Sequence, residues 1–157
     1  IGNKYFKSSE LIDVISSAED GWWKFFSATG LNEQQVENDK QLLRDFYKSK
    51  GFYEISGFAW SGNGKIRRVE VSADGGKSWF EAVLQEPVMD KSLVRFRYPW
   101  IWDGAPAMLM SRAVDSSGDI QPTMDALLKS KGPNIFYHNN AIQPWKVAAN
   151  GEISNGR

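Results

Sequence analysis

The segment from Gly51 to Val83 constrains the fold of this chain more than any other part of the sequence. It contains two glycine-rich turns, Ser61-Gly62-Asn63-Gly64 and Asp74-Gly75-Gly76, whose residues tolerate the positive φ angles of tight hairpins. The residues between these turns alternate between apolar and polar with a period of two, which is typical of a half-buried strand. They are Arg68, Val69, Glu70, Val71 and Ser72. The segment therefore predicts three short strands joined by turns.

Further strands follow toward the C-terminus. The residues of Ser92–Tyr98 and Ala107–Asp115 alternate again, and a last strand is expected near Ala141–Val147. Ala126-Leu127-Leu128 suggests a helical turn before Gly132-Pro133. Strands that recur about every ten residues with turns between them favour an immunoglobulin-like antiparallel β-sandwich over a barrel. We therefore expect a mainly β domain over residues 50–157.

Residues 1–49 have a different pattern and are expected to form a short helical extension or the remnant of a preceding region. Apolar residues three and four apart predict helices near Glu10–Ile15 and Val36–Tyr47. Ser8 or Ser9 could cap the first helix, and Asn32 could cap the second. The aromatic cluster Trp22–Phe26 between the helices either packs against another part of the protein or forms a docking patch for a partner.

Charge and composition exclude several partners. Nineteen basic residues balance nineteen acidic ones, so no net field attracts the chain to nucleic acid or to an anionic membrane. No apolar run approaches the ~18 residues that a membrane span needs. The absence of cysteine excludes disulfides, thiolate catalysis and thiolate-bound metals.

A search for catalytic groups assigns none. His138 is the single histidine, and no HExxH motif or EF-hand loop is present. The two glycine-rich turns do not open a helix after a strand, so they are interpreted as turns and not as phosphate loops. Asp115 and Asp119 could contribute to a calcium site, but too few ligand residues accompany them, and a hairpin turn is the simpler interpretation. We therefore expect no catalytic and no metal-binding residues.

Four segments in the second part of the chain carry a recognisable pattern. They are Ile55–Gly62, the hairpin Val69–Trp79, Ser111–Asp115 with Gln121-Pro122, and Tyr137–Val147. In this order they resemble the C-terminal dimerisation domain of the sulfite oxidase family of molybdopterin oxidoreductases, and most of all the molybdenum subunit of bacterial sulfane or sulfite dehydrogenase. The resemblance covers residues 51–155 and not residues 1–49. It implies a fragment, a separated domain or a diverged stand-alone relative.

The resemblance also implies a function. In that family a molybdopterin-binding catalytic domain precedes the sandwich and carries the cysteine that binds molybdenum, so this chain is expected to bind no cofactor itself. Its expected role is non-catalytic: dimerisation, and lining of the active site of a molybdenum-dependent sulfite or sulfane dehydrogenase in sulfur oxidation. The implied partners are a second copy of the chain, the molybdopterin-bearing domain or subunit, and a cytochrome c electron acceptor. The implied compartment is the periplasm.

The same resemblance assigns two groups of site residues. In animal sulfite oxidases an arginine near the last strand helps to hold the substrate anion, and Tyr137, His138, Asn139 and Asn140 stand near that place here. They are expected to face substrate, although Asn and His in a loop also commonly bind backbone groups. Trp60, Trp100 and Trp102 are expected at the dimer interface, where aromatic residues are enriched, or else in the core. Arg112 is expected to pair with Asp115 or another acid within the sheet.

A function of another class remains open. Immunoglobulin-like sandwiches also occur as free-standing modules that bind proteins or carbohydrates, and such modules display tryptophans on their turns. A dimerisation domain predicts a homodimer that shows activity only with a molybdopterin-bearing polypeptide. A binding module predicts a monomer that binds its ligand alone.

Overall fold

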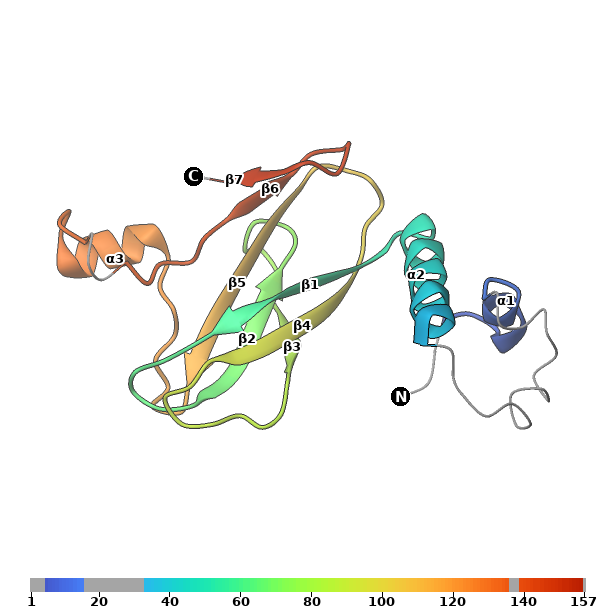
Figure 1. Cartoon of the computed structure of the whole chain (residues 1–157). Helices are drawn as coiled ribbons and strands as arrows, with labels where there is room; N and C mark the ends of the chain where they lie inside the picture. The colour runs from blue at the N-terminus through green and yellow to red at the C-terminus, as the bar shows by residue number, and fades with distance from the viewer. Residues whose placement is uncertain (1–4, 16–32, 136–138, 157) are drawn as a thin grey trace. The chain divides into compact units, whose positions relative to one another are not determined.

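The computed structural model describes residues 5–15, 33–135 and 139–156 (Figure 1). The chain divides into two compact units, Ile1–Tyr53 and Glu54–Arg157. The division lies close to the boundary expected near residue 50, but the assignment of separate domains to the two parts stays a prediction. The aromatic cluster Trp22–Phe26 and the proposed cap Asn32 lie outside the described residues.

The first unit contains two helices, α1 (Ser8–Ile12) and α2 (Glu33–Ser49). Lys7 occupies the N-cap of α1, and its backbone amide donates to the carboxylate of Glu10 over 3.2 Å. Ser8 and Ser9 lie inside the helix, so the expected serine cap was wrong. Apolar spacing located both helices, but α2 extends beyond the residues that the spacing indicated. Aromatic side chains pack edge to face in this unit, with Phe6 in contact with Phe46, Tyr47 and Phe52.

The second unit is the expected mainly β domain. Its strands are β1 (Phe52–Ala59, which begins in the first unit), β2 (Ile66–Ser72), β3 (Phe80–Leu84), β4 (Val94–Ile101), β5 (Ala107–Asp115), β6 (Trp145–Val147) and β7 (Ile153–Asn155). They form one curled sheet in the order β1-β4-β3-β2-β5-β6-β7. Figure 1 shows β1 and β4 lying across β2 and β5, which gives the two layers of an immunoglobulin-like sandwich.

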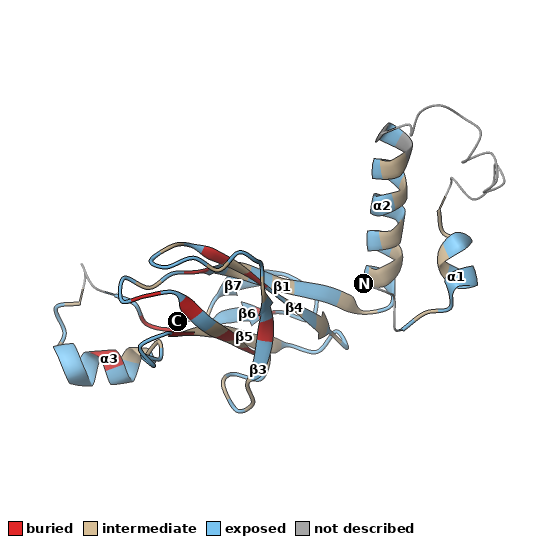
Figure 2. Ribbon diagram, turned by 90° about the horizontal axis from the view of Figure 1, so that it is seen from below, coloured by how far each residue is buried: buried red, intermediate tan, exposed pale blue. Residues whose placement is uncertain are grey.

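The core lies between these layers (Figure 2). Strand β2 contributes Ile66, Val69 and Val71, each at most 2% exposed. A bulge explains why Ile66 and Val69 share a face although they are three positions apart: Ile66 pairs with Asp115, whereas Arg68 pairs with the preceding Val114. The extra residue shifts the alternation by one position. The other buried residues of the cluster are Ala59, Ala82, Val94 and Phe96.

One helix, α3 (Met124–Lys131), interrupts the strands and confirms the helical turn suggested there. Thr123 Oγ1 accepts a hydrogen bond from the amide of Ala126 at its start, and Gly132 with a φ of 75° ends it. The last expected strand is shorter than predicted, because only Trp145–Val147 of residues 141–147 pairs in the sheet. Strand β7 was not predicted, since its three residues are all exposed and give no alternating pattern.

Gly57 on β1 leaves room for the ring of Phe96 on the neighbouring strand β4. A Cβ at this position would lie 2.8 Å from the ring of Phe96. Substitution Gly57→Val is therefore expected to destabilise the fold by about 1–3 kcal/mol through overpacking. The measurement is the urea-unfolding midpoint of the purified chain. Ser56→Val, on the exposed side of the same strand, is the control and should leave the midpoint nearly unchanged.

Candidate functional site

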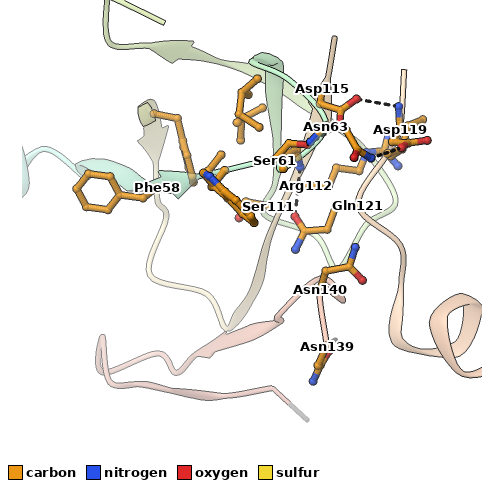
Figure 3. A pocket seen from close by; sticks show the side chains of 18 of the residues that line it. Phe58, Ser61, Asn63, Ser111, Arg112, Asp115, Asp119, Gln121, Asn139 and Asn140 are labelled. Atoms are coloured by element: carbon orange, nitrogen blue, oxygen red, sulfur yellow. Dashed lines mark hydrogen bonds between the residues drawn. The ribbon is translucent and has the colours of Figure 1, made fainter. Parts of the chain in front are cut away.

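A pocket of about 730 Å³ lies in the second unit, at the end of β1 and beside β5 (Figure 3). This volume is within the range of sites that hold small molecules. Its floor is apolar because buried core residues reach it: Ala59, Ile66, Val69 and Phe96. Its remaining wall comes from segments far apart in the sequence, namely the turn after β1, the middle of β5, Asp119–Gln121, the end of α3 and Asn139-Asn140.

Asp115 fixes the turns at one side of this pocket. Ser61 Oγ donates to one of its carboxylate oxygens over 2.6 Å. Ser117 Oγ and the amides of Ser117 and Asp119 donate to the other oxygen. The hydrogen bonds from Ser117 and Ser61 lower the pKa of Asp115 below its ordinary value, against the effect of burial. The carboxylate thus ties the turn after β1 to the turn after β5, as the hairpin-turn interpretation requires.

A cluster of three charged side chains connects β2 to β5. Arg112 Nε donates to Glu70 Oε2 over 2.6 Å, and Arg68 Nε donates to Glu70 Oε1 over 3.1 Å. The Arg112 guanidinium also lies 4.1 Å from the centre of the Trp79 ring. Burial opposes ionisation of Glu70, but the hydrogen bonds from Arg112 and Arg68 outweigh it and lower the pKa of Glu70. Arg112 therefore pairs with another acid, as expected, and that acid is Glu70.

The structure describes two of the four residues that the sequence led us to expect at the substrate. Asn139 and Asn140 line the pocket, and Figure 3 shows them below Gln121. Asn139 Oδ1 accepts a hydrogen bond from the amide of Ala141 over 3.2 Å, which is a local backbone role. Tyr137 and His138 lie outside the described residues. Their roles, and those of both asparagines, stay predictions.

The structure separates the three tryptophans assigned to a dimer interface. Trp60 lines the pocket, is exposed, and donates from Nε1 to the Lys91 carbonyl over 3.3 Å. Trp100 lies in β4 and Trp102 directly follows the strand. Both are half-buried, and their rings are stacked with their centres 5.7 Å apart. Trp102 donates to the Ala105 carbonyl over 2.7 Å. The place of these three residues at a dimer interface stays a prediction.

Sequence reasoning missed Gln121 and Lys131 as pocket residues. Gln121 stood out only as part of the motif Gln121-Pro122, and its side-chain oxygen accepts from the amide of Ala113 over 3.2 Å. Lys131 lies at the last position of α3. No local pattern marks either residue, because their place in the pocket depends on how distant segments fold together.

Comparison with known proteins identifies the fold. Residues 31–144 match the model of the Mo-co oxidoreductase dimerisation domain. The chain belongs to this family. The matched range begins at residue 31, so it includes α2, which the sequence resemblance had left outside. The resemblance to the sulfite oxidase family is thereby confirmed, and its range is extended toward the N-terminus.

Individual relatives agree with the family. The crystal structure of the sulfane dehydrogenase SoxCD from Paracoccus pantotrophus is 53% identical, with a TM-score of 0.66, over 68% of this chain and 27% of that one. Sulfite oxidase of Gallus gallus is 36% identical over 46% of this chain and 17% of its own length. A nitrate reductase of Hordeum vulgare is 31% identical over 62% of this chain and 12% of its own length. This dimerisation domain thus spans a small part of each relative.

The described residues offer no set of side chains that could bind the molybdenum of a cofactor. No three His, Cys, Asp or Glu side chains come together in the part of the chain that the structure describes, and the whole sequence lacks cysteine. Among the same described residues, no helix is long and apolar enough to cross a membrane.

The lowered pKa of Asp115 predicts acid sensitivity. A carboxylate whose pKa is lower in the folded chain than in the unfolded chain stabilises the folded state at a pH above its ordinary pKa of 3.8. This stabilisation is lost as the pH falls through the lower pKa of the folded chain. The urea-unfolding midpoint should therefore fall as the pH is lowered from about 5 to about 3, and Asp115→Asn should make this dependence shallower.

The control for this measurement is Glu152→Gln, which removes an exposed carboxylate before β7. It should leave the pH dependence of the unfolding midpoint as it is in the unsubstituted chain. An unchanged pH dependence in Asp115→Asn would contradict the role assigned to the Asp115 hydrogen bonds.

Proposed function

We propose that this chain is the non-catalytic dimerisation and site-lining domain of a molybdenum-dependent enzyme that oxidises sulfur compounds. The observation that carries the proposal is the 53% identity to the sulfane dehydrogenase SoxCD over two thirds of this chain. The match to a nitrate reductase has an identity of 31%, so sulfur chemistry is favoured over nitrate chemistry. Sulfite and sulfane sulfur are the two proposed substrate classes.

The redox step is not assigned to residues of this chain. Molybdopterin, where it is bound, would supply the oxidation chemistry from a neighbouring catalytic domain or subunit. The residues described here supply shape and hydrogen-bond donors. The proposed assembly is a homodimer in which each copy supports one molybdenum-bearing unit, with a cytochrome c as electron acceptor and the periplasm as compartment.

The pocket supports a role in lining a site for an anionic sulfur group. Its polar wall contains the side-chain amides of Gln121, Asn139 and Asn140 and the cationic residues Arg112 and Lys131. Asp115 and Asp119 also line it, but their carboxylates accept hydrogen bonds from neighbouring side chains of the chain itself. Amide N–H groups and an ammonium group donate hydrogen bonds to oxyanions, and the ammonium adds a favourable charge. Tyr137 and His138 precede the two asparagines in the sequence, so we include them in the proposed substrate-facing segment.

An isosteric charge change tests the lining role. In the assembled, molybdenum-loaded enzyme, Asn140→Asp places a negative charge in the pocket wall and should raise the KM for sulfite roughly 10-fold, the equivalent of ~1.4 kcal/mol of like-charge repulsion. The value of kcat should stay unchanged, because the lost interaction is binding common to the ground and transition states. Steady-state kinetics of both enzymes give the two constants.

Asn38→Asp on α2 is the matched control, since it makes the same chemical change at an exposed residue of the first unit that does not line the pocket. It should leave KM unchanged. Equal KM values for the Asn140→Asp and unsubstituted enzymes would exclude the pocket from the substrate site.

The enzyme assignment itself is tested by affinity purification of the native assembly through this chain. The proposal expects molybdenum by elemental analysis and reduction of cytochrome c when sulfite or thiosulfate is added. Native material without molybdenum that is monomeric and binds a glycan or a protein by itself would instead establish the free-standing binding module.

A further inference from the structure

One face of the second unit is unusually apolar for a surface. On β1, Gly57 and the side chain of Ala59 face the core, so Phe58 and Trp60, which directly follows the strand, face outward, with 66% and 60% of their surface exposed. Leu93, just before β4, and Val83 on β3 are 67% and 69% exposed. We call this surface the β1–β4 face, defined by Val83, Phe58, Trp60, Leu93 and Arg95.

These residues are neighbours in the sheet and not scattered. The Arg95 guanidinium on β4 lies 5.7 Å from the centre of the Phe58 ring on β1. Val83 on β3 lies opposite Arg97 on β4, and Arg97 forms an ion pair with Glu54 on β1 over 3.0 Å. Figure 1 shows β1 and β4 side by side in one layer. The apolar side chains and Arg95 thus form one patch across three strands.

Arg95 carries a polar atom that this patch does not satisfy. Its Nε is buried, and among the described residues it has no hydrogen-bond partner. A buried donor without an acceptor costs free energy, so native proteins rarely retain one without a reason. The neighbouring Arg97 on the same side of β4 does have its acid, Glu54. The guanidinium of Arg95 also forms no ion pair among the described residues, so a carboxylate from another molecule would neutralise its charge.

The same face also offers an acid. Glu81 lies two residues before Val83 and therefore on the same side of β3, and it is exposed. It has no ion pair in the described part of the chain. A two-fold axis brings each surface against its own copy, so residue i meets residue j twice. Arg95 of one copy and Glu81 of the other can therefore form an ion pair, and the symmetry repeats this ion pair.

We propose that two copies of this chain pair through the β1–β4 face, with Phe58 and Leu93 packed at its centre and Arg95 of each copy bound to Glu81 of the other. The proposal rests on the dimerisation role stated above and names its surface. Exposed aromatic residues and arginine are the types that anchor protein interfaces. Trp100 and Trp102 fit the role less well, because both are half-buried and stacked on each other.

A charge reversal tests the pairing directly. Sedimentation velocity on the purified chain should show a dimer, and Arg95→Glu should raise its dissociation constant at least 10-fold, because like charges then meet twice across the axis. The double variant Arg95→Glu with Glu81→Arg restores the opposite charges and should recover the dimer. A purely structural role for Arg95 would not give this rescue. Circular dichroism checks that each variant is folded.

Phe58→Glu tests the apolar part of the face in the same assay and should also raise the dissociation constant at least 10-fold. Ile153→Glu is the matched control, since Ile153 on β7 is exposed to a similar extent, 62%, outside the β1–β4 face. It should leave the dimer intact. A dimer unaffected by Phe58→Glu and Arg95→Glu overturns this inference and leaves the dimerisation role standing. A chain that is monomeric without any substitution overturns both.

Discussion

The close approach of β1 to the rest of the core determines most of what the second unit can do. Gly57 and Ala59 are small, so the inner side of β1 can approach Phe96 and the valines of β2. The large side chains of Phe58 on this strand and of Trp60 directly after it consequently point outward. A sandwich that is stable alone would normally place its aromatic residues inside. Exposed aromatic side chains that lie together are typical of a surface that another molecule covers.

Two aspartates hold the turns that frame this arrangement. Asp74 accepts hydrogen bonds from Ser78 and Ser72 and from the amides of Lys77 and Ser78, and those of Ser78 contribute most to lowering its pKa. Asp115 does the same for the turns beside the pocket. In both cases a short polar side chain replaces backbone hydrogen bonds that the turn cannot make. Hydrogen bonds to an ionised carboxylate therefore hold both turns, and the turns beside the pocket depend on Asp115 staying ionised.

The alternating pattern of β2 and the turn chemistry around it predicted the sandwich, because both are local properties of the sequence. The partner of Arg112 was only partly predictable. Asp115 lies three residues away on the same strand and so points to the opposite face, whereas Glu70 lies directly across from Arg112 in the register of β2 and β5. Asn139 and Asn140, which were expected to face substrate, line the pocket, but the pocket as a whole could not be predicted. Its wall combines residues separated by as many as 82 positions, from Phe58 to Asn140, and only the folded chain brings them together.

Phe58 and Trp60 belong to two surfaces, since they line the pocket and also form part of the β1–β4 face. Contact with a second copy would therefore hold one rim of the pocket in place. Pairing and site lining would then be linked through the same stretch of β1, and a change at Trp60 would alter both at once. Leu93 and Glu81 lie on the β1–β4 face but do not line the pocket. Substitution of Leu93 or Glu81 therefore removes pairing without a direct change to the pocket wall. If the pocket depends on pairing, such a substitution must weaken substrate binding as well as the dimer.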